Sequence, residues 1–235
     1  MSGRVGYGIF VLLGFVAAAV AKRAYERRFG SPAGEHRQAL SAAAFVGAAL
    51  GAKLGMVLYE PPTRVLGDLL SLRLVGDGKT VIGAIAGGFV AVELAKKHLG
   101  IRARTGDAYA VALPLGVAIG RLGCAVAGCC YGRPTDSFLA VHVGGIDRHP
   151  APLYESAALL LLAFAQHRRA SRPRPAGHAF RETLVGMAAI RLVVDVFRGD
   201  PAHRLVGLSA AQAVCLAALV ALSIALARQP RPADA

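Results

Sequence analysis

The chain has 235 residues, of which 55% are hydrophobic and only 17% are charged, and its mean hydropathy is +0.50. Soluble domains carry about 25% charged residues, so this composition disfavours an ordinary soluble protein. In a soluble protein the net charge of +13 would suggest nucleic acid as a partner. The basic residues instead form short clusters between long apolar stretches, a pattern typical of membrane proteins and not of nucleic-acid binding.

Seven apolar stretches are separated by hydrophilic loops that contain proline and glycine: 5–21, 39–59, 81–95, 108–128, 151–166, 183–197 and 205–227. A membrane-spanning helix needs about 20 apolar residues, and about 17 can suffice. The third, fifth and sixth stretches are short and carry ionisable residues, so each alone is also compatible with a buried helix of a soluble protein. Seven in succession predict an all-α integral membrane protein with about seven transmembrane helices and a single membrane domain over residues 1–235.

The distribution of basic residues predicts the orientation. Sixteen lysines and arginines fall in the loops on one side: Lys22, Arg23, Arg27, Arg28, Arg37, Lys96, Lys97, Arg102, Arg104, Arg168, Arg169, Arg172, Arg174, Arg181, Arg228 and Arg231. The other side has eight: Arg4, Arg64, Arg73, Lys79, Arg133, Arg148, Arg198 and Arg204. The positive-inside rule makes the larger set cytoplasmic, so the N-terminus faces outward and the C-terminus lies in the cytoplasm. The first stretch is followed by a basic cluster and no small-residue cleavage site, so we expect it to be retained as a helix.

Ionisable residues inside these stretches are candidates for function, because each costs several kcal/mol in a bilayer. Four fall well inside and two lie nearer the ends: Lys53, Arg121, Arg191 and Asp195, then Glu93 and Glu155. Arg191 and Asp195 are spaced i, i+4 and can neutralise each other. Arg121 has no acid nearby in the sequence, so its partner is either elsewhere in the bundle or a ligand, and Lys53 can snorkel along its stem. Two arginines near the outer face favour an anionic ligand, with phospholipid phosphate as the obvious candidate.

Five ordered motifs resemble the prolipoprotein diacylglyceryl transferase family. Residues 120–132, Gly-Arg-Leu-Gly-Cys-Ala-Val-Ala-Gly-Cys-Cys-Tyr-Gly, resemble its signature segment. Residues 148–155, Arg-His-Pro-Ala-Pro-Leu-Tyr-Glu, and residues 190–198, Ile-Arg-Leu-Val-Val-Asp-Val-Phe-Arg, are similar to two further family motifs. Gly-Tyr-Gly at 6–8 and Leu-Ser-Ala-Ala-Gln at 208–212 resemble the start of the first and last helices. The resemblance covers nearly the whole chain.

The resemblance implies transfer of a diacylglyceryl group from phosphatidylglycerol to the lipobox cysteine of a preprolipoprotein, in lipoprotein biosynthesis at the bacterial inner membrane. It implies no cofactor and no metal, and its partners are phosphatidylglycerol, the preprolipoprotein and membrane lipids, with no nucleic acid. Arg121 and Arg191 match the family arginines placed around the lipid head group. Tyr7 and Gly132 match further functional positions, and Asp195 takes the place of a glutamate.

The match breaks at a histidine that the family carries in its third span and that is proposed to help activate the acceptor thiol. Alignment on the Arg121 motif places Val81 at that position, and alignment on the Gly-Gly pair places Ala86 there. General acid–base catalysis contributes about 10²–10⁴-fold to a reaction rate, so the absence of this histidine matters for activity. His149 can in principle substitute, although a His-Pro pair at a helix start is more often a cap or turn element.

Cysteines replace polar family residues at the outward end of the stretch 108–128. Cys124 stands at the position of an asparagine, where we expect a contact with the head group, and Cys129 stands at that of an acid, while Ala127 replaces another asparagine. Cys124 and Cys129 are five residues apart and are not expected to share a helical face well, and adjacent cysteines such as Cys129 and Cys130 rarely bridge each other.

Several roles remain open for these thiols. They can pack as small apolar groups at a helix end, pair in a disulfide if the loop bends, or act as a nucleophile beside Arg121 or Arg133. A metal site would need support from His142 or His149, and we expect none. Cys129 and Cys130 are kept as a possible thiol site, and Cys215 is expected to pack.

Two alternatives to the transferase remain. One is a related transferase with a different acceptor or a cysteine nucleophile, and the other is a non-catalytic protein that binds or moves phospholipid. The missing histidine favours both, whereas Tyr7, Arg121, Arg191 and the intact motif at 148–155 favour the transferase. A channel or proton pump is disfavoured, because the interior holds too few acids for a relay.

Overall fold

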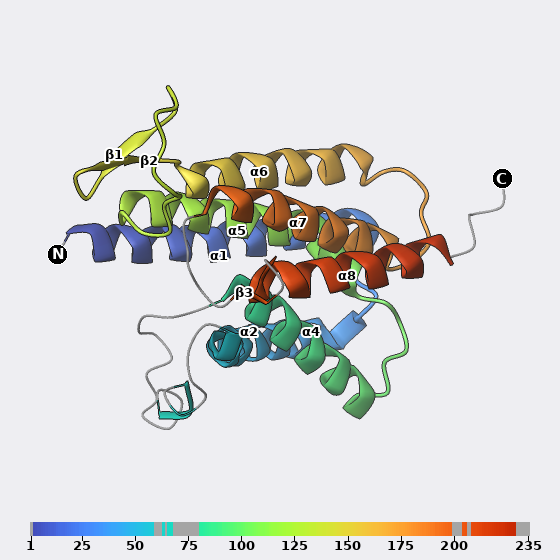
Figure 1. Cartoon of the computed structure of the whole chain (residues 1–235). Coiled ribbons are helices and arrows are strands. Elements are labelled where there is room, and N and C mark those ends of the chain that lie inside the picture. Colours follow the sequence, from blue (N-terminus) through green and yellow to red (C-terminus); the bar gives the residue numbers. More distant parts are fainter. Residues whose placement is uncertain are drawn as a thin grey trace. The chain divides into compact units, whose positions relative to one another are not determined.

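A computed structural model describes residues 2–58, 63, 65–67, 80–198, 204–205 and 208–228. Helices dominate the described part of the chain (Figure 1). In chain order the elements are α1 (Ser2–Phe29), η1 (Gly34–His36), α2 (Arg37–Leu54), η2 (Gly55–Leu58), α4 (Val81–His98), η3 (Gly106–Ala108), α5 (Tyr109–Val126), β1 (Val141–Val143), β2 (Ile146–Arg148), α6 (Ala151–Arg169), α7 (His178–Phe197), β3 (Arg204–Leu205), β4 (Leu208–Ser209) and α8 (Ala210–Ala227).

Each of the seven predicted apolar stretches falls on a helix, which confirms the mostly helical class. Helix α7 begins at His178, five residues before the predicted stretch 183–197. Helix α8 begins at Ala210, five residues after the predicted start at 205. Tyr59 of the second stretch, and Arg64, Arg73, Lys79 and Arg231 of the charge count, lie outside the described residues.

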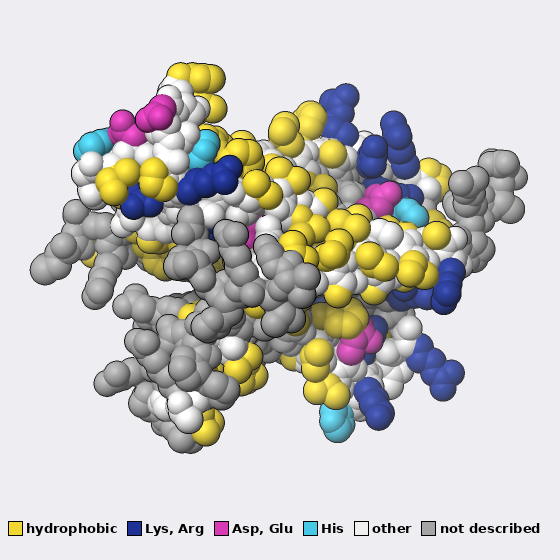
Figure 2. Space-filling view, in the orientation of Figure 1, with side chains coloured by type: hydrophobic (Ala, Val, Ile, Leu, Met, Phe, Trp, Pro, Cys, Tyr) yellow, Lys and Arg dark blue, Asp and Glu magenta, His cyan; other side chains and the backbone are white. Residues whose placement is uncertain are grey.

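The helices suit a membrane in length and surface. Within the described ranges, four regions are long and apolar enough to cross a bilayer: Val5–Phe29, Gly34–Val57, Gly106–Val126 and Ala210–Ala227. Helices α4, α6 and α7 have 18, 19 and 20 residues, or about 27–30 Å at about 1.5 Å per residue, close to the thickness of the hydrocarbon core. Large apolar side chains stay exposed on them, such as Leu161 and Phe164 of α6. Figure 2 shows apolar side chains on the surface of the described helices. The protein is therefore an apolar helical membrane protein, and the count of seven spans stays a prediction.

The described elements group into two compact units. The first comprises Met1–Gly30, Thr105–Pro201 and Gln212–Ala235, and the second comprises Ser31–Arg104 and Ala202–Ala211. Helices α1, α5, α6, α7 and most of α8 belong to the first, and α2 and α4 belong to the second. The single membrane domain over residues 1–235 stays a prediction.

In the second unit, α2 and α4 pack through glycines spaced four residues apart. A Cβ added at Gly51 would lie 2.8 Å from the Cα atom of Gly87 and would also clash with the carbonyl oxygen of Gly83. Such spacing lets two helix backbones approach closely, as in small-residue packing of membrane helices. Lys53 of α2 is buried, at 2% exposure, so its head group does not reach the surface as snorkelling would require.

We expect Gly51→Ala to lower the thermal midpoint of the detergent-purified protein, because overpacking costs about 1–3 kcal/mol. Gly8→Ala is the matched control, since a Cβ there meets no atom within 4 Å. Equal midpoints for the two variants, measured by fluorescence-detected unfolding, would contradict the close contact of α2 with α4.

In the first unit, polar contacts fix the helices that carry the charged residues. The Asp107 carboxylate accepts hydrogen bonds from the backbone N–H groups of Gly177 (2.6 Å) and Phe180 (3.0 Å), and so caps the start of α7. This cap explains why α7 begins before its apolar stretch. The buried Ser156 hydroxyl of α6 donates to the Ala118 carbonyl of α5 at 2.9 Å, one residue after Glu155. Together these contacts set the relative positions of α5, α6 and α7.

Candidate functional site

A chain of buried charges joins α5, α6 and α7. Oε2 of Glu155 lies 3.0 Å from Nε of Arg121 and 3.4 Å from Nη1 of Arg191. Oδ1 of Asp195 lies 3.2 Å from Nη2 of Arg191 and 3.9 Å from Nε of Arg198. The side chains of these five residues are only 6–13% exposed. We call them the arginine network.

The arginine network confirms one sequence prediction and completes another. Arg191 and Asp195 form the predicted i, i+4 pair. Arg121 finds its partner elsewhere in the bundle, in Glu155 of α6. Sequence reasoning noted Glu155 only as an acid near a helix end and did not assign it to either arginine.

The arginine network is suited to hold an anion. Its three guanidinium groups face two carboxylates, which leaves an excess of one positive charge. The Nε atoms of Arg121 and Arg191 are buried and have no hydrogen-bond acceptor in the described part of the chain. The Nε atom of Arg121 is close to the Glu155 carboxylate, but the N–H bond is not directed at it. Buried donors without acceptors are costly, so a ligand oxygen that accepts from them would be favoured.

A short segment after α5 ties the network to the loop before α6. Gly132 donates from its backbone N–H to the His149 carbonyl at 2.8 Å, and Arg133 donates to the Phe197 carbonyl at 3.0 Å. A Cβ at Gly132 would lie 2.7 Å from Cβ of His149 and would clash with the Phe197 carbonyl oxygen. This close approach leaves no room for a side chain at position 132, so packing accounts for a glycine there. The predicted contact of Gly132 with substrate stays a prediction.

The loop before α6 is held by a hairpin that sequence reasoning missed. Strands β1 and β2 pair antiparallel, with Val141 opposite Arg148. Gly144 and Gly145 between them both have positive φ angles, of 62° and 79°, as a type I′ turn requires. The adjacent glycines at 144 and 145 were the sequence signal that could have predicted this turn. The hairpin places Arg148 and His149 just before the start of α6.

His149 belongs to a small aromatic cluster. Its Nδ1 lies 3.4 Å from the Tyr154 hydroxyl, and its ring meets the Phe197 ring edge-on, with centroids 5.3 Å apart. Tyr154 and Phe197 are also in contact, at 5.7 Å between centroids. The ring is half-buried. These contacts give His149 a packing role, and its catalytic role stays a prediction.

Tyr7 of α1 lies against the last turns of α5. A Cβ at Gly123 would lie 3.5 Å from the Cα atom of Tyr7, so the two helices are in close contact at this level. Tyr7 interacts electrostatically with Arg121 and with Cys124, Cys129 and Cys130. The structure thus brings Tyr7, Arg121 and the three cysteines together within the first unit.

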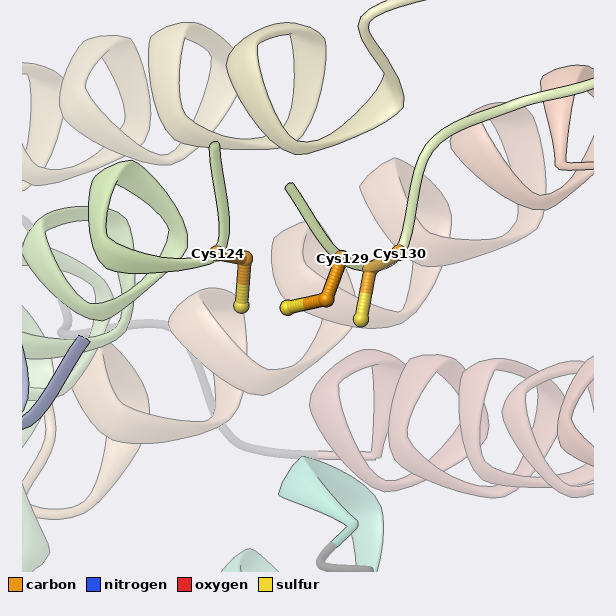
Figure 3. A group of neighbouring side chains, drawn as sticks. All are labelled: Cys124, Cys129 and Cys130. Atoms are coloured by element: carbon orange, nitrogen blue, oxygen red, sulfur yellow. The ribbon is translucent and has the colours of Figure 1, made fainter. Parts of the chain in front are cut away.

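The three cysteines converge, contrary to the expectation that Cys124 and Cys129 share no face. Their sulfur atoms all lie within 4.8 Å of one another (Figure 3). The helix ends at Val126, and Gly128 has a φ of 70°. The N–H of Gly128 bonds to the Ala125 carbonyl at 3.2 Å, and that of Cys129 bonds to the Cys124 carbonyl at 3.1 Å. These two bonds make a Schellman motif, which folds Cys129 back against Cys124.

The turn also gives Cys130 an unusual position. Its φ of 60° is the only positive value of a non-glycine residue in the described ranges. The pKa of Cys130 is lowered to about 5, because the Cys124 thiol hydrogen-bonds to it and the guanidinium groups of Arg198 and Arg121 add positive charge. Burial and the neighbouring thiols raise the pKa of Cys129. All four cysteines, Cys215 included, are free thiols, and Cys215 is buried as expected.

This difference predicts distinct alkylation profiles. Because the thiolate is the nucleophile, Cys130 should react with iodoacetamide nearly as fast at pH 6 as at pH 8. The alkylation rate of Cys129 should fall about tenfold for each unit by which the pH is lowered, as for an ordinary thiol below its pKa. Peptide mass spectrometry of the detergent-purified protein gives both rates. Cys124→Ala removes the hydrogen-bond donor and should move the Cys130 profile to higher pH, and parallel profiles for Cys129 and Cys130 in the wild type would contradict the assignment.

The two positions that could have carried the missing histidine lie on α4, in the second unit. Val81 is the first residue of α4, after Thr80, whose hydroxyl accepts from the Gly83 N–H at 3.0 Å and caps the helix. Ala86 lies in the second turn. Neither side chain can exchange a proton.

Comparison with known proteins completes the assignment. The chain matches the family "Prolipoprotein diacylglyceryl transferase" over residues 5–228. It is 32% identical over 247 residues to a phosphatidylglycerol–prolipoprotein diacylglyceryl transferase of Azoarcus sp. strain BH72, covering 97% of this chain and 91% of the relative. Similar proteins with the same name occur in Geobacter sulfurreducens (32% over 210 residues, covering 84% and 78%) and Clostridium tetani (28% over 225 residues, covering 92% and 89%). The chain therefore belongs to the prolipoprotein diacylglyceryl transferase family.

Proposed function

We propose that the protein transfers the diacylglyceryl group of phosphatidylglycerol to the lipobox cysteine of a preprolipoprotein, in the bacterial inner membrane. The observation that carries this proposal is the arginine network, with its excess positive charge and its two buried N–H groups that find no acceptor among the described residues. A phosphodiester carries one negative charge and offers oxygens that accept such bonds, so the two are complementary in charge and in hydrogen bonding.

The reaction requires little more of the protein than positioning and charge. The acceptor sulfur forms a bond to the glyceryl carbon, the bond from that carbon to the phosphate oxygen breaks, and glycerol phosphate leaves. The thiol loses one proton, and the departing phosphate gains a second negative charge. Arg121 and Arg191 would stabilise that charge from fixed positions, with Asp195 holding Arg191 in place.

Further site residues belong to the proposal. Tyr7 would line the head-group side, since it interacts with Arg121, and Cys124 would lie beside the head group as the neighbour of that arginine. His149 is the proposed acceptor of the thiol proton, because it is half-buried and is held beside Gly132. His149→Phe keeps the aromatic packing and removes the proton acceptor, so transfer should fall while stability is kept. Unchanged transfer would leave His149 with packing alone.

The chemistry disfavours Cys129 or Cys130 as a covalent intermediate. Attack of either thiolate on phosphatidylglycerol would give a thioether. Passing the diacylglyceryl group on would then require a thiolate to leave carbon under attack by another thiolate, with no gain in stability. A lipidated Cys129 or Cys130 would thus be a dead end.

The topology belongs to the same proposal: seven spans, the N-terminus outside and the C-terminus in the cytoplasm. The excess of basic residues on the C-terminal side supports it. Reporter fusions after Arg102 and after Asp136, which lie in loops on opposite sides of the fourth predicted span, should give opposite signals.

Complementation tests the function directly. The chain is expressed in cells depleted of their own diacylglyceryl transferase, and lipidation of a reporter prolipoprotein is followed by gel shift. Restored lipidation supports the transferase and shows that no histidine at 81 or 86 is needed. Stable insertion of the chain in the membrane without lipidation would overturn the proposal in favour of phospholipid binding alone.

A further inference from the structure

The three thiols beside the arginine network could together hold a metal ion, and none of them takes part in the bond changes of the proposed transfer. Figure 3 shows the side chains of Cys124, Cys129 and Cys130 at the end of α5, with their sulfur atoms close together. The three sulfurs lie within 4.8 Å of one another. Sulfurs bound at about 2.3 Å to one ion in a trigonal site lie about 4 Å apart, so a shift of under about 1 Å would close the site.

The fold holds this set in place from both sides. The Schellman motif fixes Cys129 against Cys124. The Tyr131 hydroxyl donates to the Ala125 carbonyl at 2.8 Å, which ties the residue after Cys130 back to the helix end. Gly132 then pairs with the backbone of His149. Ligands fixed in this way bind with little reorganisation.

Simple packing does not account for the three thiols. Cys124 is buried, but Cys129 is exposed and Cys130 is only half-buried. Cys130 also adopts a left-handed backbone conformation, which is unfavourable for a residue with a side chain, and this conformation belongs to the turn that brings its sulfur to the other two. An apolar role requires neither feature. The exposed Cys129 gives an ion access to the set.

We infer that Cys124, Cys129 and Cys130 bind one soft, thiophilic metal ion, for which Cu(I) is the best match. Thiolate ligands favour soft or borderline metal ions, Cu(I) and Zn(II) among them. Three sulfurs without a fourth side-chain ligand in the described part of the chain suit the three-coordinate geometry of Cu(I) better than the four-coordinate geometry of Zn(II). A Cu(I) trithiolate carries a net negative charge, and the guanidinium groups of Arg121 and Arg198 both act on Cys130 to offset it. Binding is ligand exchange: each thiol loses its proton, and no electron is transferred.

The test is a competition for Cu(I) between the full-length protein in detergent and a chromophoric Cu(I) chelator, under anaerobic, reducing conditions. The wild type and Cys215→Ser should each withdraw one Cu(I) per chain. The Cys129→Ser/Cys130→Ser variant should bind at least about 100-fold more weakly, because two of its three ligands are lost. Cys215 is the matched control, since it is a buried thiol of α8 outside the set.

A second measurement needs no variant and so does not depend on folding of the mutant. Cu(I) should protect Cys129 and Cys130 of the wild type from alkylation, as read by peptide mass spectrometry. The inference is overturned if the wild type takes no Cu(I) from the chelator, if the double variant takes as much, or if alkylation is unchanged. A disulfide between any two of the three thiols in protein isolated without reductant would also overturn it. None of these readouts depends on diacylglyceryl transfer.

Discussion

Arg121→Ala is expected to reduce diacylglyceryl transfer by about 10²–10³-fold, the loss typical of removing one preorganised charged or hydrogen-bond donor from an active site. The side chain is 12% exposed, and its Nε–H finds no acceptor among the described residues. Its charge and that free donor are the features proposed to stabilise the departing phosphate. Initial rates of reporter lipidation in membranes that contain equal amounts of each variant measure the effect.

Arg121→Lys tests whether Arg121 serves the transfer step or only the binding of phosphatidylglycerol. Lysine keeps the charge but cannot present the planar fork or the Nε–H, so transfer should remain at least tenfold below wild type. Arg168→Ala is the control, because this arginine is exposed near the opposite end of α6 from Glu155, and it should transfer at the wild-type rate. Phosphatidylglycerol binding to the purified protein is measured in parallel. If Arg121→Ala transfers the diacylglyceryl group at the wild-type rate, Arg121 has no role in the mechanism.

The sequence predicted those features that depend on residues near one another in the chain. Apolar length located the seven helices of 18 or more residues that the structure describes, because each must present enough apolar surface regardless of its neighbours. The i, i+4 spacing of Arg191 and Asp195 predicted their ion pair, since helix geometry alone brings them together. These features are local, and the tertiary fold did not alter them.

The partner of Arg121 could not be predicted in the same way. Glu155 is 34 residues away and meets Arg121 because α6 packs against α5, where the Ser156 hydroxyl donates to the Ala118 carbonyl. The sequence showed that Arg121 needed a partner, and it showed an acid at the start of the next stretch. It did not show that one carboxylate would serve both Arg121 and Arg191.

The cysteine cluster was mispredicted for a physical reason that can be named. Positions 124 and 129 do not share a face of a continuous helix, and the prediction treated the helix as continuous to Gly128. Glycine is the usual residue one position beyond a helix end, and the Schellman motif brings the next residue into contact with the one five positions before it. Gly128 was therefore the signal that Cys129 would meet Cys124.

Glu155→Gln is expected to destabilise the protein by about 3–5 kcal/mol, because it removes the carboxylate that two buried arginines share. Three guanidinium groups would then face Asp195 alone, and the excess of positive charge would rise from one to two. For a protein of this size the loss corresponds to a fall in thermal midpoint of roughly 6–20 °C. Transfer should also fall, because Arg121 would lose the contact that orients it. Thermal unfolding in detergent gives the first effect, and reporter lipidation gives the second.

The double variant Glu155→Gln/Arg191→Gln shows whether the losses of stability and of transfer in Glu155→Gln come from the changed charge balance or from the changed geometry. It restores an excess of one positive charge, so it should recover part of the midpoint that Glu155→Gln loses. It should not recover transfer, because only one of the two arginines proposed to hold the phosphate remains. If Glu155→Gln unfolds at the wild-type temperature, the carboxylate does not balance the two arginines. If the double variant regains transfer, the reaction requires the net charge and not the paired guanidinium groups.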